Sequence, residues 1–252
     1  MTRVMNRARY RVHSSAEVLV LAFVVGLGAC SPAAGVIEST TTALQTTTTV
    51  ANAPPASTTT EPATTTTTRL SAADRCLERA EFGDPAESPY ALPFPAGDGY
   101  SILQSYCHDD GSHETQLAYD FAMPIGSIVV AARGGIVVDV KEDVADDAHT
   151  RHLNYVVVEH DDGTAGFYAH LQHEGTLVEV GDEVTQGQEI GLSGATGRTG
   201  GPVLHFGVYS GFPPVDDRDV PVVFSNGDGP LDARGGLREG SFYRALPNDT
   251  ID

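Results

Sequence analysis

Short apolar runs separated by turn residues occupy the chain from residue 71 onward. The runs are rich in Val, Ile, Tyr and Phe, which is typical of β-strands. Apolar positions that alternate or cluster, as in residues 154–160, indicate an antiparallel sheet with one buried face. The sequence Asp161-Asp162-Gly163 has the composition of a hairpin turn. The pattern predicts strands at residues 100–104, 118–122, 128–132, 135–140, 155–160, 165–170, 177–179, 189–192 and 204–209.

Residues 71–252 fit one all-β domain, a compact antiparallel sheet or barrel-like fold. We place its core at about residues 90–210 and expect only a short helix, at residues 72–80. Residues 211–252 form a C-terminal extension that is rich in Pro, Gly and Asp. The extension contains one more strand-like run, at residues 220–224, and we expect it to wrap around the core.

The region before residue 71 has a different character. Residues 31–70 contain threonine runs at 46–49 and 64–68, several prolines and few large apolar residues, so they predict a disordered linker. Residues 1–30 place four arginines before an apolar run at 18–25, which is typical of an export signal and too short for a membrane span. The sequence Leu27-Gly28-Ala29-Cys30 resembles a bacterial lipobox, which predicts lipidation of Cys30. The alternative is an ordinary signal with an incidental cysteine.

The charge and cysteine content of the chain limit which partners and which cell compartment we expect. The chain has 15 Lys and Arg against 34 Asp and Glu, a formal net charge of −19, which argues against nucleic acid as a partner. A lipidated Cys30 would hold the exported domain on the outer face of the bacterial cytoplasmic membrane, as part of the cell envelope. The two remaining cysteines, Cys76 and Cys107, suggest a disulfide in an exported domain, with two buried thiols as the alternative.

Several histidines lie in sequences that suit metal chemistry. His113 and Asp120 precede and enter a predicted strand, and His205 follows a glycine-rich turn. Three protein ligands that leave one position open for water are the arrangement of a catalytic zinc site, although spacing alone does not establish one. Strand alternation predicts that Tyr168 and His170 share a face. Just before His113, the residues His108, Asp109 and Asp110 could offer alternative ligands, although a solvated loop is the expectation. The remaining histidines of the domain are expected in loops or on the surface: His149, His152, His160 and His173.

Taken together, these sequences resemble the lysostaphin-type (LytM-like) zinc endopeptidases, which cut peptide cross-links of peptidoglycan. The resemblance runs from about residue 90 to 209, with a looser continuation through 220–243. It implies a compact antiparallel β domain with zinc ligands at His113, Asp120 and His205, and an active-site histidine at His170. The matching segments are His113, residues 119–124, 130–137, 168–171, 180–188 and 194–206.

Two features depart from the family pattern. Six residues separate His113 from Asp120, where the family often has three, which indicates a loop variant. Val203 stands where the family usually has a second active-site histidine, and the period of a strand places its side chain in the same pocket as His205. Valine neither donates a hydrogen bond nor accepts a proton, and loss of one such group typically costs about 10²–10³ in rate. Tyr168 is a candidate substrate-binding replacement, because its hydroxyl can donate.

Two principal functions therefore stay open. The first is an exported zinc metalloendopeptidase of cell-wall remodelling, weakened by Val203, that acts on peptidoglycan stem or cross-link peptides. The second is a non-catalytic domain that keeps zinc and binds the wall or a partner wall hydrolase. A structural spacer on the envelope is a third reading. Intact His113, Asp120 and His205 favour metal binding in the first two cases.

Overall fold

The computed structural model describes residues 70–252 except 109–112, 147–149, 214–217 and 248–252. The predicted signal segment, the lipidation site Cys30 and the linker up to residue 69 lie outside the described residues. Within the described residues, no helix is both long enough and apolar enough to cross a membrane.

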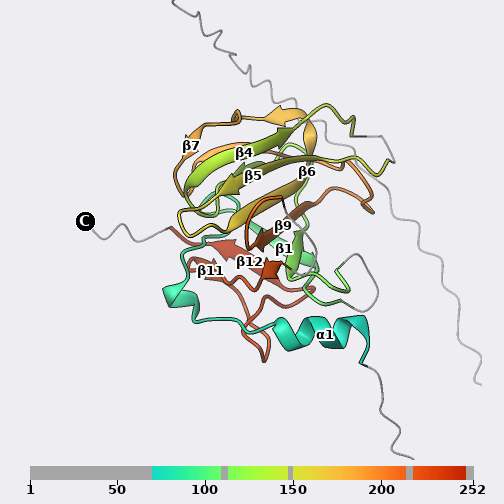
Figure 1. The fold of residues 1–252 in the computed structure, drawn as a ribbon, viewed down its shortest axis with the longest axis vertical. Helices are drawn as coiled ribbons and strands as arrows, with labels where there is room; N and C mark the ends of the chain where they lie inside the picture. The colour runs from blue at the N-terminus through green and yellow to red at the C-terminus, as the bar shows by residue number, and fades with distance from the viewer. Residues whose placement is uncertain (1–69, 109–112, 147–149, 214–217, 248–252) are drawn as a thin grey trace, which may run out of the picture. The chain divides into compact units, whose positions relative to one another are not determined.

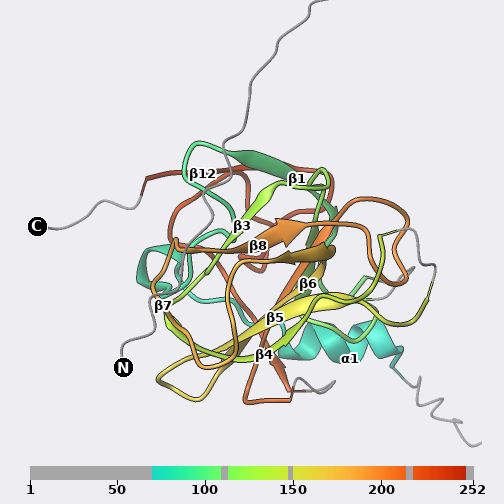
Figure 2. The same cartoon turned by 90° about the horizontal axis from the view of Figure 1, so that it is seen from above.

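The described residues form mainly antiparallel β-sheet, as the sequence predicts (Figure 1). The principal strand order is β11-β12-β1-β2-β9-β6-β5-β4-β7, and β10 pairs with β9. In addition, β8 pairs with both β3 and β6 (Figure 2). The strands are β1 (Gly99–Gln104), β2 (Ala118–Phe121), β3 (Ile128–Val130), β4 (Gly135–Lys141), β5 (Asn154–Glu159), β6 (Ala165–Thr176), β7 (Glu183–Val184), β8 (Glu189–Ser193), β9 (Leu204–Tyr209), β10 (Asp219–Val220), β11 (Gly227–Asp228) and β12 (Phe242–Ala245).

Some predicted strands were wrong. Residues 177–179 do not form a strand, because β6 ends at Thr176 and only isolated contacts follow, such as the amide of Leu177 donating to the Ile190 carbonyl at 3.0 Å. The run at 220–224 contributes only Val220 to β10, while Val222 and Phe224 are buried without ladder pairing. The short strands β7, β11 and β12 were not predicted.

One α-helix, α1 (Ala72–Arg79), is present among the described residues, close to the predicted 72–80. It begins after Ser71 because a capping box closes its first turn. The Asp74 amide donates to Ser71 Oγ at 2.9 Å, and the Ser71 amide donates to Asp74 Oδ2 at 3.0 Å. The helix buries Ala73 and Cys76, and the structure joins Cys76 to Cys107 through their sulfur atoms, with Cα atoms 5.4 Å apart.

Residues beyond 211 add strands to the core. β10 pairs with β9, and β12 pairs with β1 and β11. The hydroxyl of buried Tyr119 donates to the Val222 carbonyl at 3.2 Å, which ties β2 to this segment. Because β12, β1 and β2 are consecutive neighbours, the extension continues the same sheet that holds the candidate site.

Candidate metal centre

Two of the predicted ligands stand opposite each other on neighbouring strands. Asp120 of β2 and His205 of β9 are direct register partners in an antiparallel pair. Directly opposed residues place their side chains on the same face of a sheet, a few ångströms apart. Strand pairing therefore brings together two residues that are 85 positions apart in the chain, with His205 Nδ1 lying 2.9 Å from Asp120 Oδ1.

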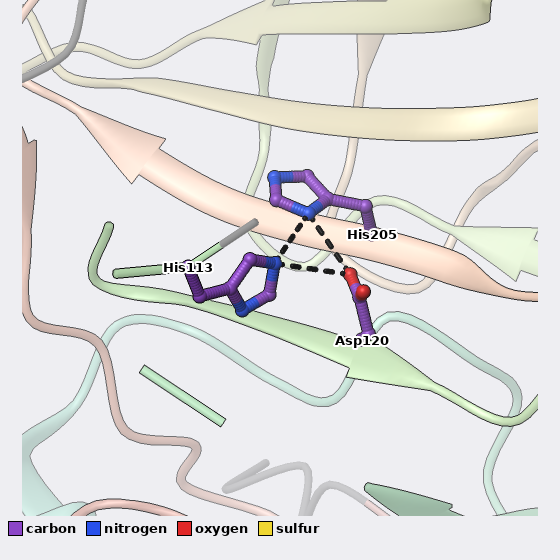
Figure 3. A group of neighbouring side chains, drawn as sticks. All are labelled: His113, Asp120 and His205. Carbon is purple, nitrogen blue, oxygen red and sulfur yellow. Dashed lines mark hydrogen bonds and ion pairs between the residues drawn. The ribbon is translucent and has the colours of Figure 1, made fainter. Parts of the chain in front are cut away.

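The third predicted ligand, His113, belongs to the loop between β1 and β2. Its Nε2 atom lies 3.1 Å from His205 Nδ1 and 3.3 Å from Asp120 Oδ1, so the three atoms form a triangle (Figure 3). The described residues bring together one group of this kind that can hold a metal ion, made of His113, Asp120 and His205. The sequence prediction placed the same three residues together.

The distances between these three atoms suit a tetrahedrally coordinated cation. Bonds of about 2.0–2.1 Å to a central ion place tetrahedral ligands about 3.3 Å apart. His113 Nδ1 donates to the Ser105 carbonyl at 3.1 Å, so in the neutral imidazole Nε2 carries the lone pair. That lone pair faces a carboxylate oxygen. A cation bound between them would remove the repulsion between the lone pair and the carboxylate oxygen. Two nitrogens with one carboxylate are also a donor set that zinc accepts.

Electrostatics keep the carboxylate charged. Burial opposes ionisation of Asp120, but its close contacts with His113 and His205 outweigh burial and hold the pKa of Asp120 well below its ordinary value. The carboxylate therefore stays anionic at neutral pH.

His170 lies beside His205 with its ring oriented by the backbone. Its Nδ1 donates to the Thr196 carbonyl at 2.7 Å, and its ring centroid is 6.0 Å from that of His205, nearly perpendicular to it. Burial lowers the pKa of His170, with a further contribution from His205. The neutral ring then carries its lone pair on Nε2, which suits it to accept a proton.

The predicted position of Tyr168 was wrong. Its side chain is fully buried, its hydroxyl accepts a hydrogen bond from the Ala132 amide at 2.7 Å, and its ring packs on Phe206. The expectation that Tyr168 shares a face with His170 assumed regular alternation. Instead, β6 has an irregular register next to His170, which adopts a left-handed backbone with φ of 64°. This irregularity turns His170 to the face of His205, and Tyr168 stays in the core.

The sequence analysis missed three residues of the site. The Ser105 and Thr196 carbonyls orient His113 and His170, and the Phe167 ring lies 6.0 Å from the His205 ring. Carbonyl contacts do not depend on side-chain identity, so a motif does not reveal them. Phe167 is two residues from Ala169, which pairs with His205, and regular alternation from that pair would have identified it.

A groove of about 730 Å³ lies against one ligand of the site. Val203 lines it together with Asp120 and is only 3% exposed. The wall is therefore apolar at that point. The sequence analysis placed Val203 in one pocket with His205, but His205 does not line this groove. Other lining residues are Leu103, Met123, Pro124 and His108.

Most other histidines stay apart from the site. His108 Nε2 lies 3.0 Å from a Glu239 carboxylate oxygen and is not part of the metal group; Asp109, Asp110 and His149 lie outside the described residues. His152 and His173 are exposed, as expected. The expectation for His160 was wrong: it is 4% exposed, with Nδ1 donating to the Gly134 carbonyl at 2.9 Å.

Comparison with known proteins gives a consistent assignment. Residues 114–217 match Peptidase family M23, a stretch that begins one residue after His113 and contains Asp120, His170 and His205. The Peptidoglycan DD-endopeptidases ShyA and ShyB of Vibrio cholerae serotype O1 are 44% identical over 87 residues and 41% identical over 108 residues. These alignments cover 34% and 42% of this chain but only 18% and 24% of the relatives, so the chain spans less than a quarter of their length.

Two solved structures are similar to part of this chain. A zinc-containing peptidase from Vibrio cholerae has 31% identity and a TM-score of 0.39, covering 53% of this chain and 41% of that one. The catalytic domain of lysostaphin from Staphylococcus simulans has 28% identity and a TM-score of 0.36, covering 51% and 88%. These sequence matches agree with the family predicted from the motifs: residues 114–217 of this chain match Peptidase family M23.

Proposed function

We propose that this protein is a zinc-dependent metalloendopeptidase that hydrolyses peptide cross-links of peptidoglycan. The observation that carries the proposal is the convergence of His113 Nε2, Asp120 Oδ1 and His205 Nδ1 within 3.3 Å of one another. The names of the relatives ShyA and ShyB support the substrate class. Their matched parts are small fractions of the whole proteins, so the substrate is inferred and not transferred.

His113, Asp120 and His205 would hold the zinc ion. When bound, zinc supplies Lewis acidity and lowers the pKa of a water ligand. The chain's own contribution to proton transfer would come from His170, whose Nδ1–H is committed to the Thr196 carbonyl. Its Nε2 is then the atom that accepts a proton and returns it to the leaving amine. The Thr196 contact fixes the ring plane and the tautomer for this role.

Val203 is the reason to expect slow turnover. It forms an apolar part of the groove wall beside Asp120, and the buried hydroxyl of Tyr168 already serves the Ala132 amide. Removing one donor to a developing oxyanion typically costs about 10²–10³ in rate. His170 would therefore act without a second histidine at position 203.

The same apolar wall favours one alternative function. In that alternative the domain keeps zinc but binds a wall peptide, or a partner wall hydrolase, without cleaving it. A hydrophobic wall next to an intact ligand set is compatible with binding in the absence of hydrolysis.

Placement in the cell envelope is part of the proposal. The composition of residues 1–70 supports an exported protein with lipidated Cys30 and a disordered linker, held on the outer face of the bacterial cytoplasmic membrane. Tethering would raise the effective concentration of the acidic domain near its substrate without relying on charge attraction. Mass spectrometry of the mature N-terminus tests this part, since an unmodified Cys30 would contradict it.

The decisive experiment measures zinc and hydrolysis in the same preparation. We expect about one zinc per chain and release of peptides from purified peptidoglycan. His170→Ala should abolish release, whereas His173→Ala, at an exposed histidine of the same strand, should not change it. Val203→His should raise the rate. Zinc without hydrolysis in the natural chain, with hydrolysis appearing only in Val203→His, would replace the peptidase proposal by the binding alternative.

A further inference from the structure

The loop that carries His113 has a support that the other two ligands do not need. Asp120 and His205 are fixed by the β2–β9 ladder, but His113 lies between β1 and β2, outside any strand. Local bonds close its base: the Cys107 amide donates to the Gln116 carbonyl at 2.9 Å, and the His108 amide donates to the His113 carbonyl at 3.2 Å. These bonds shape the loop but do not attach it to the rest of the domain.

Ser105 and His108 attach the loop to the C-terminal extension, through the Leu237 carbonyl at 2.7 Å and a Glu239 carboxylate oxygen at 3.0 Å. Helix α1 adds two further attachments. Cys76 is joined to Cys107 at the start of the closed loop. Arg79, one turn further along α1, donates from Nη2 to the Thr115 carbonyl at 2.7 Å, two residues after His113. The helix therefore holds both arms of the loop, one through a covalent bond and the other through a charged hydrogen bond.

A buried carboxylate continues this contact into the sheet. Arg79 Nη1 lies 2.6 Å from Asp219 Oδ1, and the other oxygen of Asp219 accepts from the Leu117 amide, just before β2. The Asp219 side chain is 1% exposed, against 32% for Arg79. The planar guanidinium thus bridges the loop carbonyl and a buried anion, a geometry that a single ammonium group does not reproduce.

We propose that α1, through Arg79, Asp219 and the Cys76–Cys107 pair, positions His113 for metal binding. Arg79 and Asp219 are positioning residues, because they act on His113 through the backbone of residues 115–117 and do not touch the metal. Contacts that orient a ligand from outside typically change metal affinity about 10–100-fold when removed. The helix lies outside residues 114–217, so this support is additional to the matched family domain.

This inference rests on the proposed metal site, and its test reads zinc affinity instead of hydrolysis. The full-length chain is stripped of metal and titrated with zinc against a chromophoric chelator. Arg79→Gln is expected to weaken zinc binding about tenfold or more. Because Arg79→Gln leaves the Asp219 charge buried and unpaired, the double variant Arg79→Gln with Asp219→Asn is measured as well. It removes the bridge without an uncompensated charge, and we expect the same loss of affinity.

Arg75→Gln is the matched control. Arg75 lies on the same helix, but its Nη1 donates to the Leu70 carbonyl. This variant should bind zinc like the natural chain. Hydrogen exchange of the Cys107 and Gln116 amides in the metal-free protein should accelerate in both Arg79 variants and stay unchanged in Arg75→Gln.

The outcomes separate the two proposals. Equal zinc affinity in all variants, or a lower unfolding temperature of the metal-free protein without weaker zinc binding, would assign α1 a purely structural role and overturn the inference alone. Failure of the natural chain to bind zinc would overturn both this inference and the zinc peptidase. A third outcome is that the natural chain binds zinc and hydrolyses no peptidoglycan, while the Arg79 variants bind zinc more weakly. That result would support the positioning role and overturn the peptidase proposal.

Discussion

The three ligands of the candidate metal centre are held in two different ways. Asp120 and His205 face each other across β2 and β9, where the ladder sets their distance. His113 lies on a loop that is held by contacts with α1, with Asp219 and with residues 237–239. The difference teaches that a strand pair places side chains without further help, whereas a loop ligand needs contacts from distant parts of the chain.

The largest expected effect comes from changing one of the two strand residues of the site. Asp120→Asn removes the negative charge of the proposed ligand while keeping the shape of the side chain. Residues that only orient a ligand change metal affinity up to about 100-fold, so we expect Asp120→Asn to lower zinc affinity by more than about 100-fold. A chelator competition titration measures it. Asp228→Asn, at an exposed carboxylate of β11, should leave the affinity unchanged. Equal affinities in the two variants would mean that Asp120 is not a ligand.

The next largest effect is expected from opening the crosslink between α1 and the loop that carries His113. Replacing both Cys76 and Cys107 by Ser opens a crosslink with a sequence separation of 31 residues. The chain-entropy model gives a loss of about 3–4 kcal/mol in the free energy of unfolding. Denaturant unfolding of the metal-free protein measures this loss. Alkylation with and without reductant shows whether the thiols are paired, and two free thiols in the natural chain would contradict the prediction.

A smaller effect is expected from a substitution in the turn that follows Thr196, whose carbonyl orients His170. Gly197 has φ of 85°, and a Cβ atom there would lie 2.8 Å from Leu153 Cβ and 3.4 Å from His170 Nδ1. Gly197→Ala should cost about 1–2 kcal/mol for the left-handed backbone and slow hydrolysis by displacing the Thr196 carbonyl. Gly200→Ala, in the same turn, has open space around its Cβ. If both variants behave alike in unfolding and hydrolysis, His170 does not depend on this turn.

The smallest effect concerns pH. Burial lowers the pKa of His160, which lies at the end of β5 and away from the His113 loop. Below its ordinary pKa of about 6.5 the unfolded chain takes up a proton that the folded chain resists, so stability falls as pH falls. The slope from this group is at most about 1.4 kcal/mol per pH unit. His160→Gln should reduce the slope of unfolding free energy between pH 7 and 5.5; an unchanged slope would assign it to other groups.

Local pattern predicted most of the sheet, and the order of the motifs predicted the group of three candidate ligands. Alternation around Val156 and Val158 located β5, and the sequences around His113, Asp120 and His205 indicated the metal group. These features depend on residues close together in sequence or on motif order.

What the sequence did not reveal depends on contacts between distant segments. The irregularity of β6 that separates Tyr168 from His170 arises where β6 pairs with β5, and regular alternation gave the wrong face. The bridge from Arg79 to Asp219 joins residues 140 positions apart. Similarly, His160 is buried because it meets Gly134 and Tyr90, which its own surroundings in sequence do not indicate.

The direct pairing of Asp120 with His205 has a consequence for folding fidelity. A shift of one residue between β2 and β9 would turn one of the two side chains to the opposite face of the sheet. Only the correct register then presents both donors to one ion. Zinc would therefore stabilise the correctly paired sheet over slipped alternatives, and zinc affinity would report how much of a preparation has folded in register.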